Sequence, residues 1–300
     1  MGPCDGVLIV DKEEGETSFG VVKRVKALLK VGKAGHAGTL DPFASGLLLV
    51  LVGQGTKLSS YLMAEEKTYL GTLTLGAETD TLDRTGRITA VSPVPSLELD
   101  FLRAKVEAFV GETEQTPPAF SALKVQGKRA YSLARKGVPV TLQKRRVRVK
   151  EWTLLSLEGP DLTFRVVCSS GTYVRSLAAD LGKELGVGAH LKTLRRMSSG
   201  SYRLEGALRS QDLGTVVSAE EVKERVIPLR EALPHLAEVE VDEKTAYRVR
   251  RGHQPSGQEV GVGEPLPKGD VKLVRGSELV ALVRFKPGPG SPMRVSRVFV

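Results

Sequence analysis

One glycine-punctuated segment, Gly35 to Gly46, brings together an imidazole, a hydroxyl and a carboxylate, from His36, Thr39 and Asp41. The residue before a proline is disfavoured in the helical region. We therefore expect Asp41, which precedes Pro42, to be extended, with its carboxylate directed away from the chain. Because the segment offers no core-forming run, we expect a loop that holds its side chains against a ligand. Such a carboxylate is suited to act as a nucleophile or base.

Two other interpretations of this segment stay open at this point. An Asp-Pro pair between glycines commonly forms only a turn, in which the aspartate side chain accepts backbone N–H groups. The spacing Gly35-x-x-Gly38 also matches the loop with which KH domains bind an RNA backbone. A Walker-type phosphate loop is disfavoured, because no Lys-Ser or Lys-Thr pair follows the second glycine at the required spacing.

Strands and helices alternate around this segment, which predicts a mixed α/β domain. Strands are predicted at Gly6 to Val10, Leu47 to Val52, Thr68 to Leu75, Val140 to Leu157 and Leu162 to Cys168. Helices are predicted after Thr17 and at Thr56 to Met63, Leu97 to Val110, Arg129 to Lys136 and Ser176 to Leu185. After about Leu229, glycine and proline separate short strands predicted at Tyr247 to Arg251, Val271 to Val274, Leu279 to Phe285 and Met293 to Val300. This pattern suits a small appended β-barrel or sandwich.

The charge of the chain indicates a polyanionic partner. The formal net charge is +9, and basic residues concentrate between residues 124 and 150 and again at Lys192, Arg195 and Arg196. Such clustering favours nucleic acid binding over solubility alone. Arg146 and Arg148 alternate with valines, so a strand there has one cationic and one apolar face. The stretch from 117 to 144 is a polar, basic excursion long enough to close over a ligand.

Composition also argues against several classes of protein. Cys4 and Cys168 are too few for a thiolate metal site, and the four histidines are scattered, so no metal is predicted. No run of eighteen apolar residues occurs, and the first residues lack the pattern of a secretory signal. We therefore expect no membrane association and a cytoplasmic location.

Two further segments contain groups that suit an RNA-modifying site. Tyr173 and Arg175 are two residues apart, and hence on the same side if the chain is extended there. A guanidinium holds a carboxylate ionised and oriented, and a tyrosine ring offers a face on which a base stacks. Ordinary packing explains such a pair equally well when it is considered alone. Tyr69 is a second candidate ring.

Taken in order, these motifs resemble those of the TruB-type tRNA pseudouridine-55 synthases. The matching segments are Gly35 to Pro42 with Ser45-Gly46, Lys67-Thr68-Tyr69, Ser121 to Lys124, Gly171 to Arg175, and Gly188-Ala189-His190 leading to Leu194-Arg195-Arg196. The resemblance implies an α/β (α+β) fold: a mixed, largely antiparallel central sheet, flanking helices, an RNA-binding thumb and a C-terminal PUA β-barrel. It implies a catalytic domain at 1–229, with the thumb at about 117–146, and a PUA-like RNA-binding domain at 230–300.

The resemblance also implies roles for individual residues. Asp41 corresponds to the essential carboxylate, Arg175 to its partner and Tyr69 to the ring against the target base, so these three are the expected catalytic residues. The expected substrate and RNA-binding residues are His36, which enters the T-loop, together with Thr39, Tyr173, Leu194, Lys12, Lys57, Lys124 and Arg146. The sequence departs from the family where Glu13-Glu14-Gly15 follows Lys12, in place of a proline and a glycine, and where Ala37 replaces a common threonine.

The implied activity is isomerisation of uridine 55 in the T-loop of tRNA to pseudouridine. The base is flipped out and the Asp41 carboxylate reacts, without cofactor or metal. Whether Asp41 attacks the sugar or the base, or removes a sugar proton, stays open. The expected partner is the T-arm stem-loop of tRNA, with no obligate protein partner and a monomeric state.

Two other functions remain open at this point. One is an RNA-binding or RNA-remodelling module without catalysis, which the basic excursion and the β-rich tail favour. The other is a glycosidase, which normally needs two cooperating carboxylates. Asp80 and Asp83, in the turn from Thr79 to Arg84, are the candidates for the second carboxylate.

Overall fold

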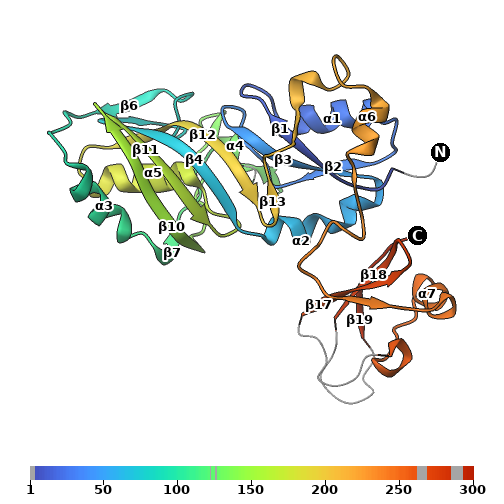
Figure 1. Ribbon diagram of the computed structural model, residues 1–300. Coiled ribbons are helices and arrows are strands. Elements are labelled where there is room, and N and C mark those ends of the chain that lie inside the picture. The colour runs from blue at the N-terminus through green and yellow to red at the C-terminus, as the bar shows by residue number, and fades with distance from the viewer. Residues whose placement is uncertain (1–3, 122, 126, 262–268, 285–292) are drawn as a thin grey trace.

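The computed structural model describes residues 4–121, 123–125, 127–261, 269–284 and 293–300 (Figure 1). A large mixed sheet of eleven strands forms the body of the molecule. Eight of the strands follow in the order β14 (Leu208–Arg209), β1 (Gly6–Lys12), β3 (Ser45–Val52), β12 (Ala189–Ser199), β4 (Lys67–Leu75), β11 (Asp161–Cys168), β10 (Arg145–Glu158) and β7 (Gly111–Gln115). The strands β2 (Ala34–Ala37), β13 (Tyr202–Arg203) and β15 (Ile227–Pro228) pair with β3, β12 and β1. Among the described residues of this sheet, only β1 with β14 and β3 with β12 pair in parallel, so the expected mixed, largely antiparallel sheet is confirmed.

Strand β3 is buried on both faces, which explains its continuous apolar run. Its residues Leu48, Val50 and Val52 belong to the core that also contains apolar residues of the helices α1 (Ser18–Leu28) and α5 (Val174–Glu184). Its alternate residues Leu47, Leu49 and Leu51 pack on the opposite side, with the helix α2 (Ser59–Ala64) and C-terminal residues. The helices α1 and α5 therefore cover the same face of the sheet, because successive residues of a strand point to opposite faces.

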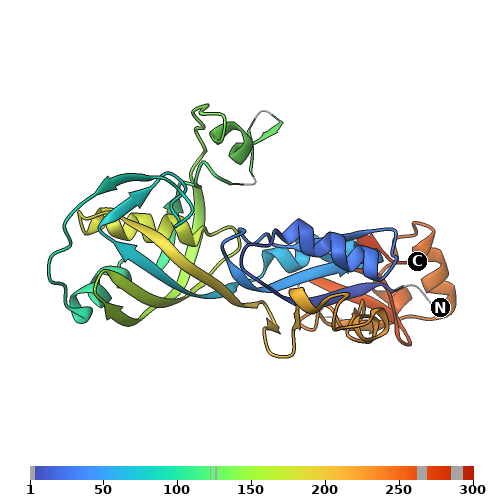
Figure 2. The same cartoon turned by 90° about the horizontal axis from the view of Figure 1, so that it is seen from above.

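The thumb projects from the face of the sheet that α1 and α5 cover (Figure 2). Its described part contains the short strands β8 (Lys124–Val125) and β9 (Lys128–Arg129) and the helix α4 (Ala130–Ala134). The strands β5 (Ala77–Thr79) and β6 (Ile88–Val91) form another small sheet, and the helix α3 (Leu99–Glu107) contacts β10 at the far end of the main sheet. Within the described residues, no helix is both long and apolar enough to cross a membrane.

A separate four-stranded sheet lies near the C-terminus, in the order β16 (Glu238–Glu240), β17 (Asp270–Arg275), β18 (Glu278–Arg284) and β19 (Arg294–Val298). In the part of the chain that the structure describes this sheet is open, so the expected closed barrel is not confirmed. The strand predicted at Tyr247 to Arg251 is wrong, because these residues continue the helix α7 (Glu243–Arg250). The Asp242 side chain caps that helix at the Thr245 N–H, and Ala246 and Val249 are buried at helical spacing.

Several boundaries differ from the predictions. The predicted helix after Thr17 is confirmed, with the Thr17 hydroxyl capping the Gly20 N–H. Strand β10 begins at Arg145 rather than Val140, and α5 begins two residues earlier than predicted. The segment predicted as a loop without core residues is partly wrong. Its first residues belong to β2, and Leu40, Phe43 and Ala44 are buried in the core. The Ser18 hydroxyl also exchanges hydrogen bonds of 3.0 and 2.9 Å with the Leu40 backbone.

Candidate active site

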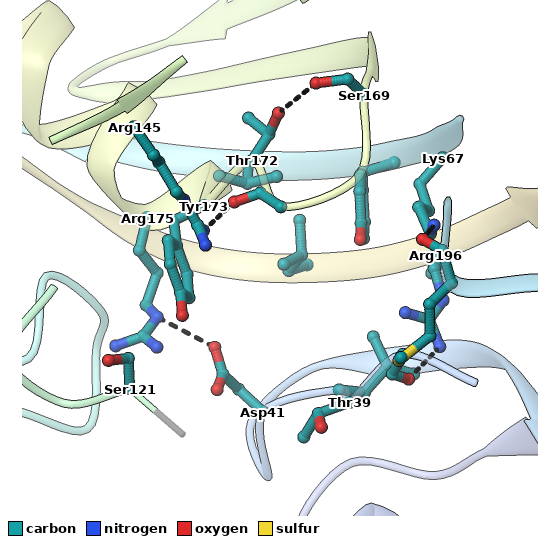
Figure 3. A pocket seen from close by; sticks show the side chains of 17 residues that line it. Thr39, Asp41, Lys67, Ser121, Arg145, Ser169, Thr172, Tyr173, Arg175 and Arg196 are labelled. Carbon is teal, nitrogen blue, oxygen red and sulfur yellow. Dashed lines mark hydrogen bonds and ion pairs between the residues drawn. The ribbon is translucent and has the colours of Figure 1, made fainter. Parts of the chain in front are cut away.

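A pocket of about 320 Å³ opens between the Asp41 loop, β4, β12 and the start of α5 (Figure 3). Six of the residues expected from the sequence line it together: Thr39, Asp41, Tyr69, Tyr173, Arg175 and Leu194. Further lining residues, which were assigned no role in the site from the sequence, include Ser121, Arg145, Ser169 and Arg196. Segments far apart in the sequence therefore converge on one small cavity.

Asp41 begins a turn that the Ala44 N–H closes on the Asp41 carbonyl at 3.1 Å. A turn is therefore present, but it is closed by the backbone carbonyl, and not by the side chain as the turn interpretation has it. The carboxylate faces the pocket, and its Oδ2 lies 2.9 Å from Nε of Arg175. The Asp41 side chain is 36% exposed, whereas that of Arg175 is only 4% exposed. Figure 3 shows the two side chains pointing toward one another. A carboxylate that solvent reaches is thus held by a buried cation.

Arg175 has a partner at each of its nitrogens. Its Nη1 donates to the Thr81 carbonyl at 2.8 Å and its Nη2 to the Phe120 carbonyl at 2.9 Å. Its Nη1 also lies 3.6 Å from a carboxylate oxygen of Asp83. The premise that Tyr173 and Arg175 share a side of an extended segment is wrong. Tyr173 is the residue before α5, and Arg175 lies in its first turn, yet both reach the pocket.

Asp83 is the second carboxylate near the site. It is buried and accepts hydrogen bonds from the Thr81 hydroxyl at 2.8 Å and the Thr85 N–H at 2.9 Å, in addition to its contact with Arg175. Asp80 instead accepts the Arg87 N–H within the same turn. Because the Asp83 oxygens face these partners rather than the pocket, Asp83 orients Arg175 and is poorly placed to protonate a leaving group. This geometry disfavours the glycosidase hypothesis.

Burial and charge act on the Asp41 carboxylate in opposite directions. Burial raises the pKa of Asp41 above its ordinary value, the Arg175 guanidinium lowers it, and the neighbouring Asp83 carboxylate raises it again. The net direction is upward. Arg175 therefore supports the charged form of Asp41, as expected, but does not fully cancel the cost of burial.

The two tyrosine rings of the pocket are fixed by different means. Tyr69 is buried on β4, and burial raises the pKa of its hydroxyl. The backbone of Tyr173 is clamped by the buried Gln115 side chain, which accepts from the Tyr173 N–H at 2.8 Å and donates to its carbonyl at 3.1 Å. The Arg145 guanidinium lies 4.3 Å from the Tyr173 ring centroid. The pocket thus offers aromatic faces beside the carboxylate, an arrangement suited to a nucleobase.

The buried Arg196 side chain supports the Asp41 loop through hydrogen bonds. It is 1% exposed and donates to the Leu47 carbonyl at 2.7 Å and the Gly38 carbonyl at 3.0 Å. At Gly46, which has a φ of +100°, a Cβ atom would lie 2.4 Å from the Arg196 carbonyl oxygen, so only glycine fits. Gly46 therefore allows β3 and β12 to approach closely next to the turn that begins at Asp41.

The second basic group of the sequence is engaged within the fold. Arg196 is buried, Lys192 pairs with Asp161, and Arg195 pairs with Asp11 at 2.6 Å. Two of the three cations thus meet a carboxylate from another strand, which clustering in the sequence does not indicate. The prediction for β10 is confirmed, since Arg146 and Arg148 are exposed on one face while the intervening valines are buried.

Lys12 is placed for support rather than for RNA contact. It is fully buried, and its Nζ donates to the carbonyls of Glu13 at 2.9 Å, Glu16 at 2.8 Å and Pro42 at 3.4 Å. Burial lowers the pKa of Lys12 to about 8. The unusual turn after Lys12 is well formed, because the Gly15 N–H donates to the Pro42 carbonyl at 2.7 Å. Lys12 thus fixes the residue that follows Asp41.

The other expected RNA-binding residues lie outside the pocket lining. Lys57 donates to the Val298 carbonyl at 2.7 Å and lies over the Phe299 ring, so it joins the main sheet to the C-terminal strand. His36 is half-buried on β2, where burial and then the Arg196 charge lower its pKa. Arg146 is exposed on β10. Lys124 belongs to β8, and its side chain lies outside the described part of the structure.

Comparison with known proteins identifies the family. The family model of the N-terminal domain of TruB family pseudouridylate synthases matches residues 26–174, and that of the C-terminal domain of tRNA pseudouridylate synthase B matches residues 175–235. The tRNA pseudouridine synthase B of Syntrophus aciditrophicus is 43% identical over 285 residues, covering 94% of this chain and 91% of that protein. That of Geobacter sulfurreducens is 42% identical over 302 residues, covering 98% and 99%.

Solved structures agree with this assignment. A chain from a crystal structure of a Cbf5-Nop10-Gar1 complex aligns with a TM-score of 0.74 at 27% identity, over 98% of this chain and 85% of that chain. A chain of an H/ACA RNP bound to a substrate RNA containing 2'-deoxyuridine aligns with a TM-score of 0.73 at 26% identity, over 99% and 86%. With two family models in succession and relatives above 40% identity along nearly its whole length, the chain belongs to the TruB family of pseudouridylate synthases.

Proposed function

We propose that this protein isomerises uridine 55 in the T-loop of tRNA to pseudouridine, with Asp41 as the reacting carboxylate and without a cofactor. The observation that carries the proposal is the ion pair between the partly exposed Asp41 and the buried Arg175 in a pocket lined by Tyr69 and Tyr173. Membership of the TruB family and the names of the relatives, which specify tRNA, support the reaction class and the substrate.

The reaction needs no redox change. The bond between N1 of uracil and C1' of ribose breaks, a bond between C5 and C1' forms, C5 loses its proton and N1 gains one. Asp41 can serve as nucleophile toward the sugar or the base, or as a base that starts elimination. Uridine reaches a narrow pocket only after it leaves the loop stack, at a cost of about a few kcal/mol. Stacking on Tyr69 returns about 1 to 3 kcal/mol of this cost.

We assign catalysis to residues 1–229 and RNA binding to the thumb and to a PUA-like part at 230–300. A contact near the start of the thumb supports this assignment. The Phe120 carbonyl accepts a hydrogen bond from Arg175 and so connects the pair of Asp41 and Arg175 to the thumb. The separate C-terminal sheet supports the division of roles. We propose the T-arm stem-loop of tRNA as the partner and a monomer as the active state.

The test uses a T-arm stem-loop that carries tritium at C5 of uridine 55 only. Because isomerisation expels the C5 proton, tritium release measures turnover. We expect release by the parent protein and by Asp100→Asn, a control that changes an aspartate exposed on α3. We expect Asp41→Asn to release no more tritium than a sample without enzyme.

Three outcomes would contradict parts of the proposal. Normal turnover by Asp41→Asn would exclude the carboxylate. Tight binding without turnover by the parent protein would instead indicate an RNA-binding module without catalysis. Nucleotide-resolution mapping of full-length tRNA after incubation checks the position, and pseudouridine found only at other uridines would exclude position 55.

A further inference from the structure

We infer that one flank of α1 is a second tRNA-binding surface, which contacts phosphates outside the catalytic pocket. The surface consists of Phe19, Lys23, Lys26 and Lys30, here named the α1 stripe. The inference rests on the proposed function insofar as tRNA is the substrate. It adds a binding surface that the catalytic pocket, the thumb and the C-terminal sheet do not contain.

Phe19, Lys23 and Lys26 share one flank of the helix, because their spacing of i, i+4 and i+7 brings side chains to the same side of an α-helix. Lys30 lies just beyond the helix end, after the C-cap residue Leu29. All four are exposed, and Phe19 is 61% exposed although it is a large apolar residue. The Lys23 ammonium lies 4.9 Å from the centroid of the Phe19 ring. The stripe therefore presents three cations and one aromatic face to the surroundings.

Helix α1 contains basic residues but no acidic ones, unlike other surface helices. No acidic residue occurs between Thr17 and Leu40, whereas the surface helices α3, α6 (Ala219–Glu224) and α7 each mix acidic and basic residues. Within the helix, Lys23 and Lys26 stand at i and i+3, and such like charges repel. Lys26 lies in the last turn, where its charge is favourable to the helix dipole, but the charge of Lys23 has no acidic neighbour on the helix. The stripe is therefore a cationic surface that α1 itself does not neutralise, which suits a polyanion.

Lys30 adds an independent observation. It follows the C-terminal residue of the helix with a φ of 52°, in the left-handed region that favours glycine at this position. The Val31 N–H donates to the Lys26 carbonyl at 3.3 Å, which closes the helix end around Lys30. A glycine lies only two residues later, at Gly32. The chain thus keeps a cation where glycine would be less strained. The charge of Lys30 is favourable at the C-terminal end of the helix, and its exposed side chain is also available to a phosphate.

The position of the stripe fits a substrate that already occupies the pocket. Helix α1 lies on the face of the sheet from which the thumb projects (Figure 2), and its first residue, Ser18, hydrogen-bonds Leu40 in the pocket-lining loop. The opposite flank of α1 is occupied, because Arg24 pairs with Glu16, which contacts Ser210, and Leu28 packs near Gly214. The stripe is therefore continuous with the catalytic face and is turned away from these contacts.

Lysines neutralise phosphates as point charges, and each neutralised phosphate releases counterions from the RNA. The salt dependence of binding therefore tests the proposal. The double variant Lys23→Ala/Lys26→Ala removes two cations of the stripe. Its matched control, Arg103→Ala/Lys105→Ala, removes two cations of α3, where both pair with carboxylates. Fluorescence anisotropy gives the Kd for unmodified tRNA at several salt concentrations.

We expect the plot of log Kd against log salt to become shallower by roughly 0.7 to 0.9 for each phosphate that the protein no longer neutralises. The slope of the stripe variant should therefore be smaller by roughly 1.4 to 1.8, while the α3 control keeps the slope of the parent protein. A slope of the stripe variant equal to that of the parent would overturn the inference. Phe19→Ala should weaken binding without changing the slope, and unchanged affinity would exclude stacking on this ring.

Lys30→Gly separates binding from folding. Because glycine is less strained at this position, the variant should melt at the same temperature as the parent or higher, yet its salt slope should be shallower by the amount expected for one phosphate. Weaker binding that accompanies a lower melting temperature would overturn this assignment of Lys30. The binding experiment requires no turnover. A parent protein that binds tRNA through the stripe but makes no pseudouridine would refute the proposed function alone.

Discussion

Removal of Arg175 is the most direct test of how the site is held together. Its buried guanidinium lies 2.9 Å from Asp41 and 3.6 Å from Asp83, and donates to two carbonyl groups. Methionine is long, flexible and uncharged, so Arg175→Met removes all four interactions while filling much of the same space. The perturbation therefore acts on charge and hydrogen bonding more than on packing.

The expected cost follows from which partner is left without its cation. Asp41 reaches the pocket and its water, but Asp83 is 5% exposed and stays buried beside the emptied position. Breaking a buried ion pair by removing one partner costs about 3 to 5 kcal/mol. We expect the free energy of unfolding to fall by this amount. The double variant Arg175→Met/Asp83→Asn should recover at least about 1 kcal/mol, because the two residues are coupled.

The pH dependence gives a second readout. Burial raises the pKa of Asp41, and the Arg175 charge is the largest influence that opposes this rise. Without Arg175 the pKa rises further. Since the proposed function requires Asp41 to be ionised, turnover is expected to fall as the pH drops through this pKa. The acid limb of the single-turnover rate should therefore move to higher pH in Arg175→Met.

Urea unfolding and tritium release under single-turnover conditions measure the two effects. The control is Arg165→Met, which breaks an exposed pair of 2.6 Å with Glu151 and should change stability by less than about 1 kcal/mol. If Arg175→Met were no less stable than this control, the buried ion network would not hold the site. An acid limb at the parent's position would refute the argument that Arg175 opposes the effect of burial on Asp41.

Two further predictions concern neighbouring residues. The pKa of Lys12 is lowered from 10.5 to about 8 in the folded protein. Between these two pH values the unfolded state keeps the Lys12 proton and the folded state loses it, so a rise in pH favours the folded state. The stability of the parent relative to Lys12→Met should therefore increase as the pH rises through this window. Urea unfolding on both sides of pH 8 checks this, and a constant difference would contradict it. Tyr69→Ala should lower kcat/KM by roughly 5- to 150-fold because the base can no longer stack, whereas Tyr69→Phe keeps the ring and should stay near the parent. Tritium release at subsaturating substrate measures kcat/KM for both variants. Equal losses of kcat/KM in Tyr69→Ala and Tyr69→Phe would assign the role of Tyr69 to its hydroxyl rather than to its ring.

Local patterns predicted the elements that bury a continuous or regular apolar surface. The apolar run at Leu47 to Val52 and the helical spacing after Thr17 both appear in the structure, because burial on a fixed face imposes a fixed period. Strand β12, at the centre of the sheet, was not predicted. Two register shifts, between Leu191 and Thr193 and between Arg196 and Ser198, break the alternation that would have revealed it.

The prediction of a strand where the structure has α7 was wrong for the opposite reason. Its residues Tyr247 to Arg250 alternate between apolar and basic types, as a strand does, and glycine follows shortly afterwards. The decisive signal lay upstream, where Asp242 caps the helix and Thr245 begins the buried face. Four residues are therefore too few to distinguish the alternation of a strand from the period of a helix. The cap residue and the full eight-residue helix together do distinguish them.

The candidate site was predicted in its principal residues but not in their support. The motifs indicated Asp41, Tyr69 and Arg175, which share the pocket. The support of Arg175 by Asp83, and that of the loop by Arg196, depend on contacts between segments distant in sequence. Asp83 had one signal, a carboxylate within a threonine-rich turn, which indicates local hydrogen bonding. That signal alone does not indicate which cation the carboxylate meets.

The distribution of cations shows most clearly what sequence clustering leaves undecided. Lys192 and Arg195 are close in sequence and yet are paired, because β12 lies between strands that supply carboxylates. The cations of α1 are interrupted by valines and resemble an ordinary amphipathic helix, yet their spacing gathers them on one exposed flank. The net charge of +9 therefore does not identify the RNA-binding surface. The pairing of distant strands decides which cations are neutralised within the fold and which are presented to a phosphate.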